Sequence, residues 1–116
     1  MLEPRQQVLG GFFCDNFNTF FFYSFSMSLE EYRKEIDRIN HDLAELIAER
    51  MEVVEKVGEY KKENNMEIKD EGREEVVKDQ FADIFKQNDL PGQKGRKLAH
   101  FLISMAIEEE EEVKEE

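Results

Sequence analysis

The sequence has one cysteine and two histidines in 116 residues, and both scarcities exclude classes of site. Because Cys14 has no second cysteine to pair with, neither an intramolecular disulfide nor a cysteine-based zinc site can form within the chain. His41 and His100 have no neighbouring cysteine and no metal-ligand spacing, so we expect no metal. There is also no glycine-rich phosphate loop and no serine nucleophile motif, so covalent catalysis has no candidate residue.

Positive charge is also scarce, with 16 basic against 28 acidic side chains and a formal net charge of −12. Binding to a phosphate backbone is driven by the counterions that basic side chains release from it, and a surface this acidic cannot supply that contribution. We therefore expect no nucleic-acid partner. An anionic ligand must instead be bound by a local pocket of cations. A chain this short is marginally stable alone, which makes self-association a reasonable expectation.

The composition changes near residue 28. Seven of the ten phenylalanines lie in residues 1–27, and the remainder of the chain is rich in Lys and Glu. Residues 1–27 lack the compact small-residue cleavage site of a secretory signal, and their apolar run is too short to span a membrane. We predict that residues 1–27 are an extension outside the fold, that residues 28–116 form the domain, and that the protein has no membrane partner.

A strong helical pattern begins at Ser28, which forms a capping-box pattern with Glu31. Apolar residues then recur mostly in steps of three and four, at Leu29, Tyr32, Ile36, Ile39, Leu43, Leu46, Val54 and Val57. We predict a helix that ends near residues 64–65, about 35 residues and roughly 50 Å long. Such a helix is too long for a compact monomer of this size. It needs a partner along its length, and its near-heptad seam favours a second helix of the same kind.

Two shorter helices are expected after it. Asp70 is a good N-cap for a helix over residues 71–88, with a predicted buried face made of Val77, Phe81, Ile84 and Phe85. Residues 88–92 break the chain. A third, apolar helix then ends in the acidic run 108–112 and a charged tail. The chain has no internal repeat and no convincing strand, so the sequence predicts an all-α fold of one long helix and two shorter ones.

Two cations share one face of the long helix. Arg50 falls where the rhythm calls for an apolar residue, and Lys61 lies 11 residues later, three full turns and about 16 Å along the same face. This pair could close around a small dianion, or it could snorkel from a helix seam and pair with glutamates. Arg33 lies 17 residues before Arg50, about 25 Å away on a rigid helix. If Arg33 and Arg50 cooperate, Arg33 must come from an antiparallel partner chain, which a two-fold dimer would supply.

Acids and a cation also gather at the start of the second predicted helix, in the segment Asp70-Glu71-Gly72-Arg73-Glu74. Capping by Asp70 and acids that complement the helix dipole would explain this segment without any ligand. Gly72 does not suit that purpose, because glycine costs about 1 kcal/mol in a helix.

As a set, these residues resemble the all-helical chorismate mutases, in their small single-function archaeal or bacterial form. The residues that carry the resemblance are Arg33, Ile36-Asp37, Asp42, Leu46-Ile47-Ala48-Glu49-Arg50, Val57-Gly58, Lys61 and Ile68-Lys69-Asp70-Glu71-Gly72-Arg73-Glu74. The resemblance covers residues 29–112 with no gap. The combined spacing is specific, although each piece alone would be weak.

The resemblance implies an intertwined antiparallel homodimer with two equivalent active sites. It implies a cytoplasmic isomerase of aromatic amino-acid synthesis that rearranges chorismate to prephenate with no cofactor and no metal. By analogy with the family, Arg50 would bind one substrate carboxylate, and Arg33 from the partner chain would bind the other. Lys61 would donate to the ether oxygen, where negative charge develops as the C–O bond breaks.

The resemblance also assigns the substrate's ring hydroxyl to the start of the second helix. Asp70, through its backbone, and Glu74, through its side chain, would hold this hydroxyl, and Arg73 would support that corner of the site. Catalysis would then consist of compacting a flexible dianion and placing donors at a developing oxyanion.

The third helix departs from the family pattern. Members often carry a small polar residue and, four positions later, a glutamine that donates to the ether oxygen; in ungapped register these positions are Ala106 and Glu110. An ionised Glu110 would repel the developing charge, so Glu110 must carry a proton to take the catalytic role of the glutamine. A slipped register with Ser104 and Glu108 is the runner-up.

Two other functions stay open at this point. A lyase on the same fold would remove pyruvate from isochorismate. A non-catalytic helical dimerisation or regulatory module would use the same helices without any of the cations being essential.

Overall fold

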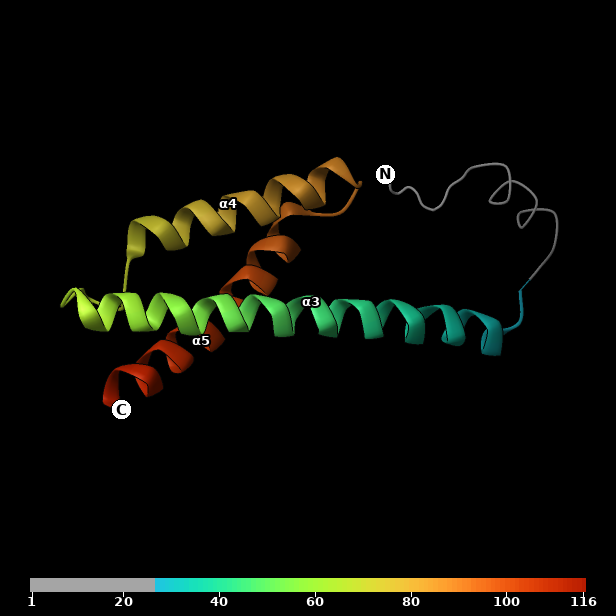
Figure 1. Ribbon diagram of the computed structural model, residues 1–116. Coiled ribbons are helices and arrows are strands. Elements are labelled where there is room, and N and C mark those ends of the chain that lie inside the picture. Colours follow the sequence, from blue (N-terminus) through green and yellow to red (C-terminus); the bar gives the residue numbers. More distant parts are fainter. Residues whose placement is uncertain (1–26) are drawn as a thin grey trace. The chain divides into compact units, whose positions relative to one another are not determined.

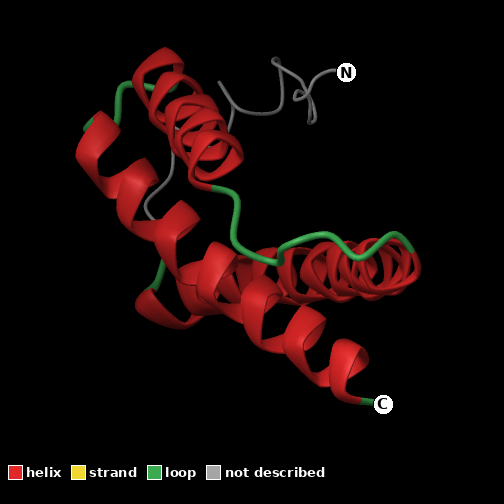
Figure 2. Ribbon diagram, turned by 90° about the vertical axis from the view of Figure 1, so that its left-hand side faces the viewer, coloured by secondary structure: helices red, strands yellow, loops and turns green. Residues whose placement is uncertain are grey.

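The computed structural model describes residues 27–116, where the chain forms three helices joined by loops and no strand (Figure 2). Helix α3 runs over Leu29–Glu63, α4 over Glu71–Gln87 and α5 over Gly92–Glu115 (Figure 1). The predicted all-α fold of one long helix and two shorter helices is confirmed. The predicted extension, residues 1–27, lies outside the described residues except for Met27.

Local sequence signals determine both ends of α3. At its start the backbone N–H of Glu31 donates to Ser28 Oγ at 3.2 Å, and the backbone N–H of Ser28 donates to Glu31 Oε1 at 2.9 Å. This is the capping box that the sequence predicts. After its end, Asn65 adopts a φ of 54°, a left-handed conformation that asparagine tolerates. The chain reverses there, and the N–H of Met66 donates to the Lys61 carbonyl at 2.8 Å.

The chain divides into two compact units after Ala44, and α3 continues through the division. In the first unit, the apolar residues of α3 are 49% to 62% exposed; they are Leu29, Tyr32, Ile36, Ile39 and Leu43. The seam predicted from the sequence is therefore an exposed apolar stripe in the single chain.

The second unit, Glu45–Glu116, has a small core between α4 and α5. Val77, Ala99 and Ile103 are buried there, with Phe81 and Ile107 packed against them. The helices approach closely at Gly95, where a Cβ atom would lie 2.5 Å from the Phe81 carbonyl oxygen. A side chain at this position would push the two helices apart.

The predicted buried face of α4 is wrong at one of its four residues, Ile84. Val77 is buried and Phe81 and Phe85 are half-buried, but Ile84 is 54% exposed. The buried face of α4 also includes Ala82, which is 6% exposed. It is therefore centred about a quarter-turn away from Ile84.

The end of α5 also differs from the prediction. The acidic run 108–112 is helical, and α5 continues to Glu115 with Glu110 and Val113 buried. Helix α5 crosses α3 (Figure 1), and the reason for its continuation is a close approach to α3 at Gly58. A Cβ atom on Gly58 would lie 3.2 Å from Glu110 Cα and 3.3 Å from Val113 Cβ. One side of the acidic run is thus packed against α3, while the other side faces solvent.

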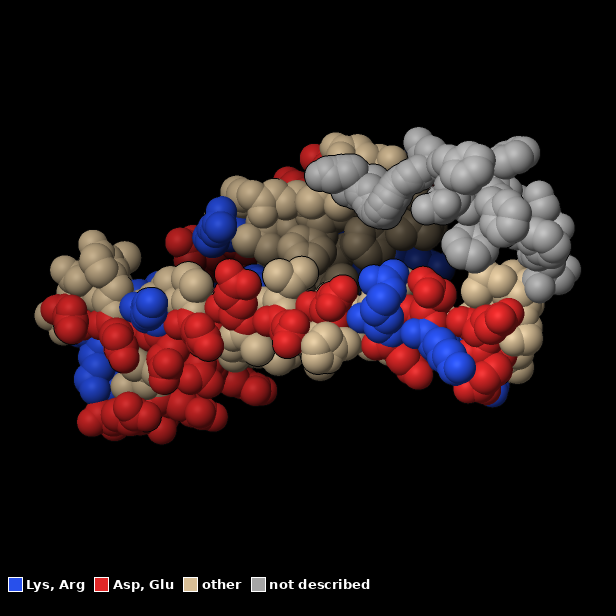
Figure 3. All heavy atoms as spheres, turned by 45° about the vertical axis from the view of Figure 1, so that its right-hand side comes forward, with Lys and Arg blue, Asp and Glu red and all other residues tan. Residues whose placement is uncertain are grey.

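Acidic side chains predominate on the face of the molecule drawn in Figure 3. Acids of α4 pair with an arginine: Arg96 of α5 bonds Glu75 at 2.9 Å and Asp79 at 2.8 Å. The hydrogen bond from Arg96 holds the pKa of Glu75 below its usual value. No helix in residues 27–116 combines the length and the apolar character that crossing a bilayer requires.

Candidate active site

A pocket of about 340 Å³ lies within the second unit, between the second half of α3, the loop before α4, and helices α4 and α5. Its polar wall consists of Arg50, Lys61, Asp70, Arg73, Glu74 and Glu110. Its apolar wall consists of Val53, Val54, Val57, Ile68, Val77, Ile103, Ala106 and Ile107. The structure thus brings together six of the seven site residues named from the sequence.

Arg50 reaches this pocket from α3, one turn before the buried Val54. Its guanidinium nitrogen Nη1 is buried and has no hydrogen-bond partner among the described residues. A buried donor without a partner is costly, and guanidinium donors are matched in geometry to carboxylates. Arg50 is therefore suited to bind an anionic group that enters the pocket.

Lys61 lies three turns farther along α3, and its side chain is 16% exposed. Its ammonium donates to the Ile68 carbonyl at 2.7 Å and to Glu110 Oε1 at 2.8 Å. Because an ammonium has three donors, these two bonds leave one N–H for a third acceptor. The ammonium is thus fixed by α5 and by the loop before α4, with a donor to spare.

Glu110 is the only acid among the described core residues and is 7% exposed. It lines the pocket together with Ala106, as the ungapped register predicts. The alternative pair does not line it: Glu108 is exposed, and Ser104 Oγ donates to the His100 carbonyl at 3.0 Å within α5. The geometry therefore favours Glu110 over Glu108 as the acid of the site.

The start of α4 forms the other end of the pocket. Asp70 is the N-cap that the sequence predicts, and its Oδ1 accepts the N–H of Arg73 at 3.0 Å. Its carbonyl accepts the N–H of Glu74 at 3.0 Å. These two bonds fix Asp70 at the start of α4, where it lines the pocket.

Lys69 is a partner of Glu74 that the sequence did not reveal. Its ammonium bonds Glu74 Oε2 at 2.9 Å, and this hydrogen bond raises the pKa of Lys69. Lys69 precedes the helix and Glu74 lies within it, so no helical spacing links the two residues. The bond occupies one carboxylate oxygen of Glu74 and leaves Oε1 for another donor.

Arg33, the seventh site residue named from the sequence, does not line the pocket. It lies on the first half of α3 and is exposed. The described single chain therefore supplies one arginine to the pocket from α3.

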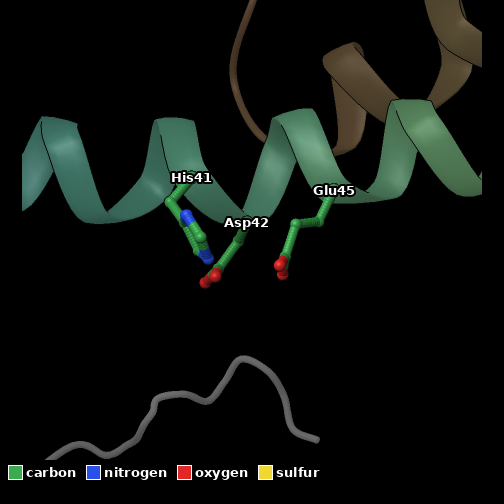
Figure 4. A group of neighbouring side chains, drawn as sticks. All are labelled: His41, Asp42 and Glu45. Carbon is green, nitrogen blue, oxygen red and sulfur yellow. The ribbon is translucent and has the colours of Figure 1, made fainter.

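His41, Asp42 and Glu45 form another polar group, on the exposed surface of α3 (Figure 4). One potential ligand atom from each residue lies within 4.8 Å of the others. The sequence analysis did not single out this group. Exposed polar side chains one turn apart on a helix are common without any ion, and we assign no site here.

Comparison with known proteins decides the family. Residues 32–111 match the family described as chorismate mutase type II. The chain is also 33% identical over 75 residues to the chorismate mutase of Methanocaldococcus jannaschii, a match that covers 65% of this chain and 76% of that protein. No solved structure gives a significant match. The chain belongs to the chorismate mutase type II family.

The match to the chorismate mutase family includes the entire polar wall of the pocket and also Arg33. It ends at residue 111, within the acidic run of α5. The last turn of α5, residues 112–115, therefore lies outside the residues that match the chorismate mutase family. Val113 in that turn nevertheless packs on Gly58 of α3.

Proposed function

We propose that this protein is a chorismate mutase that rearranges chorismate to prephenate in the pocket formed by Arg50, Lys61 and Glu110. Family membership supports this activity. The observation that carries the assignment to this pocket is the buried Nη1 of Arg50, which lacks a partner among the described residues. A dianionic substrate would supply the missing acceptor. A cytoplasmic location remains a prediction.

The proposed binding mode follows from the donors and acceptors of the pocket. Arg50 binds one carboxylate of chorismate. At the opposite end, the ring hydroxyl accepts the N–H of Asp70 and donates to Oε1 of Glu74, while Lys69 holds Oε2. Arg73 supports that corner. The apolar wall surrounds the ring and excludes water, which strengthens these polar contacts.

The rearrangement breaks the ether C–O bond and forms a C–C bond within one molecule, so no group leaves and no nucleophile is needed. Negative charge develops on the ether oxygen as the bond breaks. The remaining N–H of Lys61 donates to this oxygen, in a geometry already set by Ile68 and Glu110. A donor fixed in advance stabilises the transition state without reorganisation during the reaction.

We further propose that the working enzyme is an antiparallel homodimer in which Arg33 from the partner chain binds the second carboxylate. Two observations support this. The apolar stripe on the first half of α3 is about half exposed in the single chain, and a second copy of the helix would cover it. Arg33 also lies about 25 Å from Arg50 along the same helix, too far for one small ligand.

The test is an assay of chorismate loss with product analysis. We expect the wild-type protein to form prephenate, and Lys61→Ala to lower kcat/KM by about 10²- to 10³-fold, the usual cost of losing one donor to a developing oxyanion. The matched control is Lys56→Ala on the same helix, where Lys56 is exposed and outside the pocket. A normal rate in Lys61→Ala would overturn this mechanism, and release of pyruvate from isochorismate would instead identify a lyase.

A further inference from the structure

The C-terminal end of α5 is helical although it contains glutamates that repel one another. The run 108–112 consists of five glutamates, and Glu108 and Glu112 repel each other at a spacing of four residues. Glu111 and Glu115 do the same. Nevertheless α5 is helical to Glu115. Contacts outside this helix must therefore offset the repulsion.

These contacts come from α3 and from the loop that follows it. Val113 is 5% exposed and packs against Gly58 of α3. A Cβ atom added to Gly58 would lie 3.3 Å from the Cβ atom of Val113. Lys62 of α3 donates to the Val113 carbonyl at 3.4 Å. Lys114 donates to the Met66 carbonyl, in the loop before α4, at 3.2 Å. Two lysines thus join the end of α5 to the region where α3 ends.

The same loop orients the catalytic ammonium. The Ile68 carbonyl, two residues beyond Met66, accepts from Lys61 at 2.7 Å, and Ile68 lines the pocket. The loop then leads to Asp70. Any change in the position of Met66 is therefore transmitted over two residues to the carbonyl that holds Lys61.

We propose that the last turn of α5, residues 112–115, is a positioning element of the active site, in which Lys114 holds the loop and so keeps the Lys61 ammonium aimed at the reacting ether oxygen. This inference rests on the proposed chorismate mutase activity. Lys114 itself touches no substrate. We expect its effect mainly on kcat, because Lys61 acts on the developing charge. Arg50, which binds the carboxylate, lies on α3 outside the loop, and Asp70, which contacts the ring hydroxyl, is held separately by its bonds to Arg73 and Glu74 of α4.

The test compares Lys114→Met with wild type in steady-state kinetics on chorismate. We expect kcat to fall between about three- and tenfold, the range for losing one ordinary solvent-exposed hydrogen bond, with KM nearly unchanged. Lys114→Arg keeps a donor of similar reach and should restore most of kcat. Lys56→Met, on the exposed surface of α3, removes the same charge elsewhere and should leave kcat at the wild-type value.

A second measurement does not depend on activity. Amide hydrogen exchange in residues 66–70, followed by mass spectrometry, should be several-fold faster in Lys114→Met than in wild type or Lys56→Met. Wild-type kcat and exchange in Lys114→Met would overturn the inference, and so would an equal loss of kcat in Lys56→Met. If the wild-type protein does not convert chorismate, the proposed function fails, while the exchange experiment still tests whether Lys114 holds the loop.

Discussion

Glu110 is a buried acid whose carboxylate accepts a hydrogen bond from Lys61, the lysine that the proposed reaction needs. Two roles are compatible with this geometry. A protonated Glu110 could donate to the ether oxygen beside Lys61, as a glutamine would. An ionised Glu110 could instead orient Lys61 and contribute no donor of its own. The two roles differ in how the reaction rate depends on pH.

If Glu110 serves as a donor, turnover rises toward acidic pH, because only the protonated form can donate and only the ionised form repels the developing charge. Glu110→Gln donates at every pH, so its profile of kcat/KM should be flat over the range in which the wild-type enzyme changes. The measurement is kcat/KM for chorismate from pH 5 to 8. Superimposable profiles for the two proteins would exclude the donor role and leave orientation of Lys61.

At the residue scale, what local sequence patterns could predict is limited to positions on one helix, and only the family resemblance linked residues of different helices. The helical period alone brings Arg50 and Lys61 to one face, and a capping rule alone identifies Asp70. The ion pair between Lys61 and Glu110 joins residues 49 positions apart and depends on how α5 crosses α3. No local pattern contains the crossing angle of these two helices. The family resemblance placed both residues near the ether oxygen, but the direct bond by which Glu110 orients Lys61 emerged only from the structure.

At the scale of the helices, Gly58 determines how closely α5 approaches α3. A Cβ there would meet the backbone of Glu110 at 3.2 Å, closer than an ordinary contact. Glu110 and Val113 would both have to move away. The Lys61–Glu110 hydrogen bond, now 2.8 Å, crosses the same interface and would lengthen.

We predict that Gly58→Ala lowers kcat/KM about tenfold, because a small displacement of a positioned group is costly in catalysis. The gain of about 1 kcal/mol in helix propensity should be offset by overpacking of about 1–3 kcal/mol, so stability stays level or falls. Gly72→Ala is the matched control, because its Cβ would meet only Asp70 Oδ1 at 3.6 Å. That variant should gain about 0.5–1 kcal/mol in urea unfolding. Full activity in Gly58→Ala would contradict this role of the close approach.

The helices themselves were largely predictable, because their caps and breaks are local. Ser28 and Asp70 mark two starts, and residues 88–92 separate α4 from α5. The end of α5 was not predictable, since five glutamates in a row are typical of a solvated tail. What makes that run helical is Val113 packed on Gly58, a contact between residues 55 positions apart. Burial of Ile84 was predicted wrongly for the same reason, because small residues decide which face of α4 meets α5.

At the scale of the whole molecule, one chain supplies only part of each proposed active site. The pocket has Arg50 on α3 and Arg73 on α4, and the proposed binding mode gives Arg73 to the corner of the ring hydroxyl. The second carboxylate of the dianion is then left without an arginine, and Arg33 is exposed on the first half of α3. The antiparallel dimer that we propose would bring Arg33 of one chain to Arg50 of the other, twice by symmetry. Each active site would then depend on both chains. The dimer can therefore be tested by co-expressing two chains that carry different substitutions.

We predict that co-expressing Arg33→Ala and Arg50→Ala chains restores activity that neither variant has alone. In a mixed dimer, the site that combines Arg50 of one chain with Arg33 of the other is intact, and the second site carries both defects. If chains pair at random, half of the dimers are mixed and half of their sites work, so about a quarter of wild-type activity should return. The measurement is chorismate turnover per chain after purification of the co-expressed protein.

The control pair is Arg50→Ala with Lys61→Ala. Both residues line the pocket of the same chain, so every site in a mixed dimer carries one of the two defects. Co-expression of this pair should give no recovery, even though its chains assemble in the same way. Recovery in the control would show that activity returns for a reason other than shared sites. Failure of the first pair to recover, with both chains present in one dimer, would place Arg33 outside the active site and leave each pocket with the cations of its own chain, Arg50, Lys61 and Arg73.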